Sequence, residues 1–373
     1  MSSLRLASAS LLWALSGALV ACGSDPEPLS SGNHDIHGDG DGDGDGDGDG
    51  DGDGDEGDGD TGDGDTGDGD RGDGDVGDGD VGDGDVGDGD GDVVGDGDGD
   101  TATPGCCKDC ICRGADPADG VLDKNGPFKT AKYTDGFRNG PEFGAATVYY
   151  PTDAPPPLAG VIMCPGYTAV QSSIAAWGPF FASHGIVLVT IDTNTTGDQV
   201  PQRAKALLDA LDSLKQENTR DGSPLKGKLS KDRYGLSGWS MGGGGTWIAT
   251  AAHPELKTGV TLAGHNATAG GGQIAAGSKV PTLMLNGADD TSILGGQNQT
   301  QNAYAAIPST TPKLMYIMNG EGHFSWGTPT TNGNASGRYV MAWEKTFLEG
   351  DERYRKFLLV EGPKAAVWES NLK

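Results

Sequence analysis

The sequence predicts an α/β fold, in which helices cover both faces of a mostly parallel central sheet. Short apolar runs alternate regularly with helix-like segments between residues 140 and 320. A Gly-Trp-Ser-Met-Gly pentapeptide at 238–242 lies between one apolar run and one helix-like segment. The connecting segments are too short to hold a lid domain, so we expect one domain with an open cleft.

Seven apolar runs have the length and composition of buried strands. They are rich in aliphatic and β-branched residues, and turn-forming residues separate them from the helix-like segments. The alternation of such strands with helices indicates a mostly parallel sheet. The runs span residues 146–150, 161–164, 186–191, 234–237, 259–262, 282–285 and 314–317.

Two helices are indicated most clearly. The first spans residues 201–217, where apolar side chains recur every three or four positions and so line one face. The second spans residues 246–252, shortly after the pentapeptide, and stops at His253-Pro254. The apolar face of the first helix consists of Ala204, Leu207, Leu208, Leu211 and Leu214.

Ser240, at the centre of the pentapeptide, is the candidate nucleophile. A serine at a sharp turn from strand to helix has a strained backbone and an exposed hydroxyl, as in the nucleophile elbow of α/β-hydrolases. Gly238 and Gly242 fit this geometry because side chains at their positions would collide with the neighbouring strand and helix. The pentapeptide alone occurs by chance in many proteins, so its flanking strand and helix carry much of the argument.

The order of residues along the chain then selects a histidine. In α/β-hydrolases the acid follows the serine and the histidine follows the acid. Of the six histidines, only His323 lies beyond Asp289 and Asp290, which are the two acid candidates. His323 comes shortly after the apolar run 314–317, and loops at strand ends are where such sites are built.

Four acidic residues lie between the serine and the histidine, and two of them can be set aside. Glu255 ends the helix that starts at the serine, so it points away from the site. Glu321 is two residues from the histidine and too close to orient its ring from behind. Asp289 and Asp290 remain, just beyond the buried run 280–285.

The chemistry of acyl transfer gives each candidate a role. Neutral His323 would take the proton of Ser240 as its oxygen attacks a carbonyl carbon, and the aspartate would orient the imidazole. The oxyanion formed in this step needs two backbone N–H donors. We expect one donor to be Met241, directly after the serine, and the other to be Tyr167, after the predicted strand 161–164.

The pentapeptide and several further segments resemble the bacterial cutinase and polyethylene terephthalate (PET) hydrolase family. The resemblance covers residues 125–360, which is the whole second part of the chain. The further segments are Pro165-Gly166-Tyr167-Thr168-Ala169, Gln171-Ser172-Ser173, Trp177-Gly178-Pro179, Ser183-His184-Gly185, Ile191-Asp192-Thr193-Asn194, Gly243-Gly244-Gly245, Val280-Pro281-Thr282-Leu283 and Gly322-His323-Phe324.

This resemblance implies an α/β-hydrolase that cleaves carboxylic esters, including aliphatic and aromatic polyesters, without a cofactor. It also implies that the acid is Asp290 rather than Asp289, because the segment 280–282 matches the family's strand before the acid. The expected enzyme is therefore a serine carboxylic-ester hydrolase of the cutinase and polyesterase type that works through an acyl-enzyme.

The residues expected to bind substrate depart in part from the family pattern. Where the family usually has a tryptophan in the cleft, this chain has His265, which is either part of the cleft or an exposed loop residue. Trp239 resembles the plastic-degrading subgroup and Phe324 the ordinary cutinases, so the expected lining is mixed. The predicted substrate-binding residues are Tyr167, Trp239, Met241, His265 and Phe324.

Residues 1–21 resemble the signal peptide of a bacterial lipoprotein. One positive charge, Arg5, precedes an apolar stretch at 11–20 that is too short to span a membrane. The stretch leads into a Leu-Val-Ala-Cys sequence whose cysteine, Cys22, would be lipidated and become the mature N-terminus. We therefore expect an exported, membrane-anchored lipoprotein that faces the periplasm or the cell surface. The alternative is a plain signal peptide, which would give a secreted protein.

Residues 38–100 form a nearly pure Gly-Asp tract, which the short segment 22–37 precedes. With almost no apolar residues, the tract cannot offset the entropy of ordering and should be disordered. The chain has 55 acidic and 26 basic residues, and 31 of the acidic but only two of the basic residues lie before Thr101, so the remainder is balanced in charge. Charge alone would permit weak calcium binding by the tract, but the closing glutamate of an EF-hand loop is missing.

Four cysteines cluster at 101–124, between the tract and the predicted catalytic domain at 125–373. Outside the cytoplasm, such a cluster favours two small disulfides over a metal site. Three pairings are possible, and the spacing does not choose among them. No cysteine follows Cys164, so the disulfide that the family has near its C-terminus is missing. The clustered residues are Cys106, Cys107, Cys110 and Cys112.

An active ester hydrolase is the main expectation, with an ester or polyester substrate, no metal, no nucleic-acid partner and a monomeric state. A closely related alternative is a triacylglycerol lipase or short-chain carboxylesterase with little action on polymers. An alternative from another class is a surface-tethered binding module that keeps the fold without the activity. The complete set of nucleophile, base, acid and oxyanion candidates argues against this last alternative.

Overall fold

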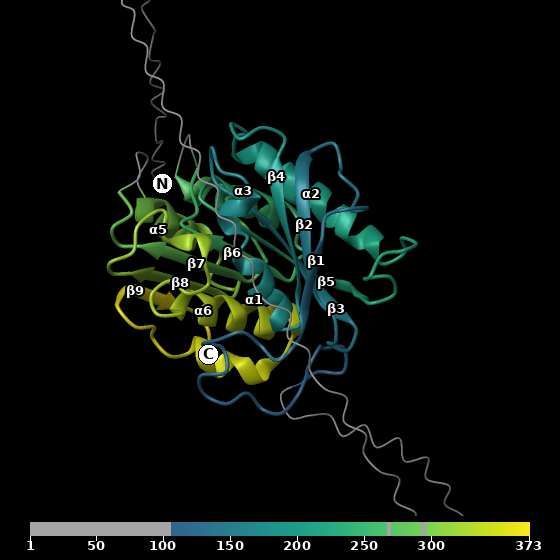
Figure 1. The fold of residues 1–373 in the computed structure, drawn as a ribbon. Coiled ribbons are helices and arrows are strands. Elements are labelled where there is room, and N and C mark those ends of the chain that lie inside the picture. The colour runs from purple at the N-terminus through teal and green to yellow at the C-terminus, as the bar shows by residue number, and fades with distance from the viewer. Residues whose placement is uncertain (1–105, 267–269, 292–295) are drawn as a thin grey trace, which may run out of the picture. The chain divides into compact units, whose positions relative to one another are not determined.

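A mixed sheet of nine strands runs through the described part of the chain, residues 106–266, 270–291 and 296–373 of the computed structural model (Figure 1). The strand order is β1-β2-β4-β3-β5-β6-β7-β8-β9. Neighbours from β4 to β8 are parallel, and antiparallel pairs flank them at both edges. The strands are β1 Thr130–Tyr133, β2 Phe143–Pro151, β3 Leu158–Cys164, β4 Val187–Thr193, β5 Leu229–Trp239, β6 Thr258–Leu262, β7 Thr282–Gly287, β8 Lys313–Met318 and β9 Ala365–Ser370.

Helices cover both faces of this sheet. The helices are α1 Trp177–Ser183, α2 Val200–Glu217, α3 Met241–Ala252, α4 Gly271–Ala275, α5 Gly296–Ala306 and α6 Ala335–Trp343, with the short turns η1 Gln171–Ile174, η2 Ser325–Gly327, η3 Glu344–Glu349 and η4 Glu352–Leu358. α1 and α6 pack on one face, and α2, α3 and α5 pack on the other (Figure 1). The predicted α/β class is therefore confirmed, with the architecture of an α/β-hydrolase.

The strand β3 shows why the predicted strands are continuously apolar. Val161 and Met163 belong to the hydrophobic cluster beneath α1 and α6, whereas Ile162 and Cys164 belong to the cluster beneath α2. Successive side chains of a strand point to opposite faces, so a strand with helices on both sides needs apolar residues at every position. All seven residues of β3 are accordingly buried.

The seven predicted strands correspond to β2 through β8, and the predicted helix at 201–217 lies within α2. The sequence pattern does not predict the two edge strands, β1 and β9. None of their residues is fully buried, and both strands carry polar side chains, such as Lys132 and Glu369, so neither has the pattern of a buried central strand. Edge strands of this kind are recognised only through the strand that they pair with.

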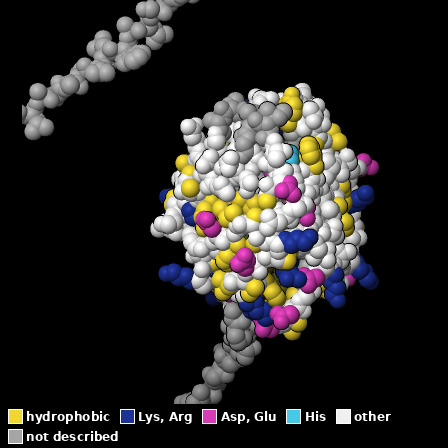
Figure 2. Space-filling view, turned by 90° about the vertical axis from the view of Figure 1, so that its left-hand side faces the viewer, with side chains coloured by type: hydrophobic (Ala, Val, Ile, Leu, Met, Phe, Trp, Pro, Cys, Tyr) yellow, Lys and Arg dark blue, Asp and Glu magenta, His cyan; other side chains and the backbone are white. Residues whose placement is uncertain are grey.

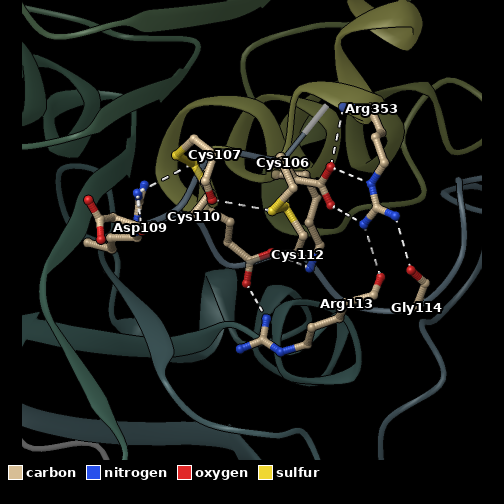
Figure 3. The surroundings of a disulfide bond; sticks show 12 residues. Cys106, Cys107, Asp109, Cys110, Cys112, Arg113, Gly114 and Arg353 are labelled. Carbon is tan, nitrogen blue, oxygen red and sulfur yellow. Dashed lines mark hydrogen bonds and ion pairs between the residues drawn. A yellow bond between two sulfur atoms is a disulfide. The ribbon is translucent and has the colours of Figure 1, made fainter. Parts of the chain in front are cut away.

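The described part of the predicted connector, residues 106–124, packs against the C-terminal part of the chain (Figure 3). The Ile111 N–H donates to the Glu349 carbonyl at 2.8 Å, and the Ile111 side chain joins the hydrophobic core. The four clustered cysteines form two disulfides, as predicted, and the structure selects one of the three pairings. The pairs are Cys106–Cys112 and Cys107–Cys110.

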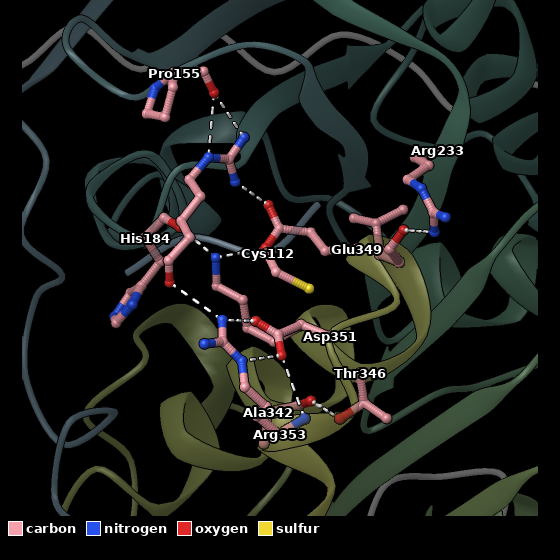
Figure 4. Close-up of polar contacts among 12 residues, drawn as sticks. Cys112, Pro155, His184, Arg233, Ala342, Thr346, Glu349, Asp351 and Arg353 are labelled. Carbon is pink, nitrogen blue, oxygen red and sulfur yellow. Dashed lines mark hydrogen bonds and ion pairs between the residues drawn. The ribbon is translucent and has the colours of Figure 1, made fainter. Parts of the chain in front are cut away.

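A group of buried charged side chains holds this connector to the C-terminal helical turns (Figure 4). Arg113 pairs with Glu349 at 2.5 Å, and Lys345 pairs with the same carboxylate at 2.6 Å. The Lys345 ammonium also donates to the main-chain carbonyl of His184 at 2.6 Å. Burial, together with Lys345, lowers the pKa of His184 to about 3, so its ring stays neutral. Removing one partner from a buried pair typically costs about 3–5 kcal/mol, because the other charge is then left buried and uncompensated.

The predicted signal peptide at 1–21, the lipidation site Cys22 and the Gly-Asp tract at 38–100 lie outside the described residues. In the part of the chain that is described, no helix is long and apolar enough to cross a membrane. On the face shown in Figure 2, basic and acidic side chains are interspersed around a band of hydrophobic side chains. This mixture agrees with the balanced charge of the sequence after the tract.

Glu344 should make the stability of the domain depend on pH. Its side chain is fully buried, and its Oε2 accepts a hydrogen bond from the Thr258 hydroxyl at 2.7 Å. Burial, helped by the charge of Glu349, raises the pKa of Glu344 from 4.5 to about 8. A carboxyl group whose pKa is raised on folding stabilises the fold most below its unfolded pKa, and this contribution is lost as the pH rises toward 8.

We expect the Glu344→Gln variant to melt close to the wild-type temperature at pH 5 and several degrees above it at pH 9, because the amide never ionises. Thermal unfolding followed by circular dichroism at both pH values measures this difference. Glu361→Gln, at an exposed position, is the matched control. A difference between Glu344→Gln and wild type that is the same at pH 5 and pH 9 would contradict the prediction.

Candidate active site

Ser240 forms the turn between β5 and α3. Its φ of 56° and ψ of −124° lie in a region that non-glycine residues rarely adopt, at a typical cost of about 1–3 kcal/mol. A β-carbon added at Gly238 would lie 2.2 Å from Gly242, and one added at Gly242 would lie 2.2 Å from the Cys164 carbonyl oxygen. The close packing of β3, β5 and α3 therefore holds the serine in its strained conformation.

Ser240, His323 and Asp290 form one hydrogen-bonded row. Ser240 Oγ lies 2.8 Å from His323 Nε2, and His323 Nδ1 lies 2.9 Å from Asp290 Oδ2. The Asp290 side chain is 1% exposed and the His323 side chain 13% exposed, so the acid is buried behind the ring. The structure thus brings together the three residues that the sequence predicts, and it places Asp290 rather than Asp289 against the imidazole.

The loops after β7 and β8 are hydrogen-bonded to each other, which sets the distance between the acid and the histidine. The Ala288 N–H donates to the Met318 carbonyl at 2.9 Å, and the Asp289 N–H donates to the Glu321 carbonyl at 3.0 Å. Since β7 and β8 are parallel neighbours, both loops leave the same edge of the sheet. Glu255, the remaining acidic residue between the serine and the histidine, is exposed and pairs with a neighbouring histidine ring.

Trp239 supports the histidine loop. Its side chain is largely buried, and its indole N–H donates to the His323 carbonyl at 2.8 Å. The indole ring also meets the Phe324 ring edge-on, with 5.8 Å between their centres. Trp239 lines the pocket as predicted, but its closest contacts are with the histidine loop.

The hydrogen-bonded row has the polarity that a proton transfer from serine requires. When His323 Nδ1–H donates to the Asp290 carboxylate, Nε2 carries a lone pair that accepts from the Ser240 hydroxyl. The buried carboxylate would then stabilise the imidazolium that forms when the ring takes this proton. The arrangement can generate an alkoxide-like nucleophile at neutral pH without help from a metal ion.

Two backbone amides lie beside the serine. Met241 is the first residue of α3, and the helix itself leaves the N–H at this position without an acceptor. Tyr167 follows β3 in a loop that passes directly beside the nucleophile, since a β-carbon added at Gly166 would lie 2.9 Å from the Ser240 β-carbon. Both residues line the pocket beside the serine, where the sequence predicts that their amides bind an oxyanion.

Ser240 lies in the wall of a pocket of about 1030 Å³. All five predicted substrate-binding residues line it, and its rim carries Phe324, which is 82% exposed, and Tyr167, which is 51% exposed. The sequence does not predict that the other lining residues contact substrate, although Thr168 and Gly322 lie in its motif segments and Asp289 is one of its acid candidates. The other lining residues are Thr168, Gln199, Asp289, Thr291, Gly322 and Ser325.

His265 belongs to the pocket, so the alternative of an exposed loop histidine is wrong. The residue is 9% exposed, and its ring meets the His323 ring edge-on with 6.0 Å between their centres. Its backbone N–H donates to the Ser240 carbonyl at 2.9 Å. Burial and the neighbouring His323 lower the pKa of His265, which favours the neutral ring. Its Nε2 is buried and has no hydrogen-bond partner among the described residues.

Comparison with known proteins then places the chain in a family. The model of PET hydrolase-like proteins matches residues 107–371, which is well over half of the chain. The chain belongs to the PET hydrolase-like family. This finding confirms the resemblance drawn from the sequence motifs, and the matched region includes most of the segment that carries the two disulfides.

Named relatives of this PET hydrolase-like chain are ester hydrolases. A bis(hydroxyethyl) terephthalate hydrolase of Streptomyces coelicolor is 36% identical over 248 residues, which cover 66% of this chain and 76% of the relative. Cutinase est1 of Thermobifida alba is 35% identical over 256 residues, which cover 68% of this chain and 82% of the relative. Cutinase 2 of Thermobifida cellulosilytica is 34% identical over 257 residues, covering 69% and 93%. The chain is accordingly a carboxylic ester hydrolase of the cutinase and PET hydrolase type.

Proposed function

We propose that this enzyme hydrolyses carboxylic esters, including polyesters such as PET, through an acyl-enzyme on Ser240. The row of hydrogen bonds from Ser240 through His323 to the buried Asp290 carries this proposal. Acyl transfer uses a nucleophile, a base and an acid that are joined by hydrogen bonds, with two backbone amides beside the nucleophile. The cutinases and the terephthalate ester hydrolase among its relatives support ester substrates.

Each residue then has one role in the reaction. Ser240 Oγ attacks the ester carbonyl carbon while its proton moves to His323 Nε2, and Asp290 stabilises the imidazolium. The tetrahedral oxyanion accepts hydrogen bonds from the Tyr167 and Met241 amides, each typically worth about 3 kcal/mol. Collapse of the intermediate expels the alcohol, which takes the proton from His323. Water repeats these steps on the acyl-enzyme and releases the carboxylic acid and free Ser240.

The pocket suits a segment of a polymer. Its volume of about 1030 Å³ is at the upper end of ordinary small-molecule sites. Tyr167 and Phe324 present exposed aromatic rings at its rim, where an aromatic acyl group can stack. Such a contact typically adds about 0.5–1.5 kcal/mol beyond burial.

His265 favours faster action on small aliphatic esters than on aromatic polyester. An imidazole offers a smaller and more polar face than the tryptophan that the family usually has at this place. We therefore keep a short-chain carboxylesterase or lipase with modest polymer activity as the second candidate function. The strained backbone of Ser240 argues against a binding module without activity, because backbone strain of this kind destabilises the fold and is typical of catalytic sites.

We also propose that the enzyme is held at a membrane through a lipidated Cys22, facing the periplasm or the cell surface. The charged start, the apolar stretch at 11–20 and the Leu-Val-Ala-Cys sequence support this placement. The Gly-Asp tract would then serve as a flexible tether between the lipid and the catalytic domain.

Ser240→Ala, His323→Ala and Asp290→Ala should each lower kcat on p-nitrophenyl butyrate by several orders of magnitude, and the acid least of the three. Circular dichroism should show an unchanged fold. Asp289→Ala is the matched control and should keep most of the activity, because its side chain lies beside the pocket rather than against the imidazole. An active Asp290→Ala together with an inactive Asp289→Ala would move the acid to the neighbouring residue.

His265→Trp should raise the rate on amorphous PET film more than the rate on p-nitrophenyl butyrate, because it restores an aromatic face to the cleft. Soluble products released from the film and the initial rate on the small ester measure the two activities side by side. Equal changes on both substrates, or a loss on the film alone, would show that His265 does not contact the acyl group.

Cys22→Ser should move the enzyme from the membrane fraction to the soluble fraction without changing its turnover number. Fractionation of the producing cells, followed by ester assays on both fractions, measures this. If the wild-type and Cys22→Ser proteins show the same distribution between membrane and soluble fractions, Cys22 does not anchor the protein.

A further inference from the structure

Arg203, on α2, is a fully buried arginine that donates to three main-chain carbonyls at the active-site edge and also lies 4.0 Å from Cys164 Sγ. Its Nη1 donates to the Pro165 carbonyl at 2.9 Å, in the loop that carries Tyr167. Its Nε donates to the Asp198 carbonyl at 2.9 Å, and its Nη2 donates to the Thr196 carbonyl at 3.0 Å. The Arg203 guanidinium thus connects α2 to two loops, the one that follows β3 and the one that follows β4.

The second of these loops extends the contact to the far side of Tyr167. The Thr196 carbonyl that accepts from Arg203 also accepts from the Thr168 N–H, at 2.9 Å. Pro165 lies two residues before Tyr167 and Thr168 directly follows it, so the anchored points bracket the Tyr167 amide. Thr168 has a φ of 60°, a conformation that a non-glycine residue keeps only when its surroundings hold it there.

The main chain of Arg203 is in turn fixed against the helix that follows the nucleophile. A β-carbon added at Gly245 of α3 would lie 3.0 Å from the Arg203 carbonyl carbon and 2.9 Å from the Ala204 nitrogen. This spacing leaves no room for α2 to move toward α3. The α3 helix carries the Met241 amide at its first position, so Arg203 spans the two helices and the loop that together hold both amides.

We propose that Arg203 is a positioning residue that sets the Tyr167 N–H at the distance from the Met241 N–H that the tetrahedral intermediate requires. The inference rests on the proposed function, in which these two amides bind the oxyanion. A guanidinium suits this task because its rigid, planar fork has five N–H donors and remains charged when buried. Carbonyl groups that accept from a charged donor are also held more strongly than those that accept from a neutral one.

Loss of this anchor should affect the transition state more than the bound substrate. The oxyanion forms only after Ser240 has attacked, and a displacement of about 1 Å in a catalytic group can cost about a hundredfold in rate. Ground-state binding in the pocket depends instead on the aromatic rim, which Arg203 does not contact. The expected signature is therefore a fall in kcat with little change in KM.

The test compares Arg203→Met and Arg203→Lys with the wild-type enzyme on p-nitrophenyl butyrate. We expect Arg203→Met to lower kcat by about 10- to 100-fold with KM within about threefold of wild type. Arg203→Lys should fall between the two, because an ammonium can keep some but not all of the three carbonyl contacts. Inhibition by phenylboronic acid, which forms a tetrahedral adduct on serine, should weaken by the same factor as kcat/KM.

Arg353→Met is the control, since Arg353 is also buried and also donates to main-chain carbonyls, but it pairs with Asp351 at the connector and does not line the pocket. Thermal unfolding should show a loss of stability in both variants, whereas kcat should fall only in the Arg203 variant. If Arg203→Met does not fold, Arg203→Lys and the boronic acid measurement decide the question.

Three outcomes would overturn the inference. The first is a loss of kcat in Arg353→Met as large as that in the Arg203 variants, and the second is a change in KM equal to the change in boronic acid inhibition. The third is a kcat of the Arg203 variants equal to that of the wild type. The activity of the wild-type enzyme distinguishes a failure of this inference from a failure of the proposed function. A wild-type enzyme without ester hydrolysis would refute the function itself, whereas an active wild type with unaffected Arg203 variants would refute only the positioning role.

Discussion

The parallel alignment of β3, β5, β7 and β8 is the constraint on which the active site depends. Parallel strands end at the same edge of a sheet, so the loops that follow them meet even when they are far apart in the chain. Tyr167 follows β3, Ser240 follows β5, Asp290 follows β7 and His323 follows β8. The short distances from serine to histidine to aspartate follow from this common edge and from the hydrogen bonds that join the last two loops.

The same edge carries backbone strain that the rest of the molecule must hold in place. Ser240 and Thr168 both have positive φ values, and such conformations persist only where the surrounding packing enforces them. The enforcement comes from a sheet that is buried on both faces and from helices packed so closely that glycine is needed at the contacts. Far from the site, the buried ion pairs and the disulfide segment tie the ends of the domain together and add stability where no catalytic geometry is at stake.

Few charged side chains line the pocket, whose described lining has one acidic residue, Asp289, and no lysine or arginine. The acidic excess of the chain lies in its first hundred residues, and burial, together with the neighbouring His323, lowers the pKa of His265 in the pocket. A pocket with aromatic side chains at its rim and few charged ones suits an uncharged ester, because little solvated charge has to be removed from water before the acyl group binds. The charged groups of the domain interior are instead paired with one another at the connector.

The sequence by itself determined the fold class, the seven central strands and the serine and histidine of the hydrogen-bonded row. It reduced the acid to Asp289 or Asp290, and the family resemblance selected Asp290. Those features depend on local signals, namely apolar runs, glycines around a serine and the order of acid and histidine along the chain. Only the tertiary structure decided which cysteines pair, that His265 faces the pocket, that edge strands complete the sheet and that Arg203 reaches the loop before Tyr167. These features arise from contacts between segments that are distant in the chain, and a contact of that kind leaves no pattern in either segment alone.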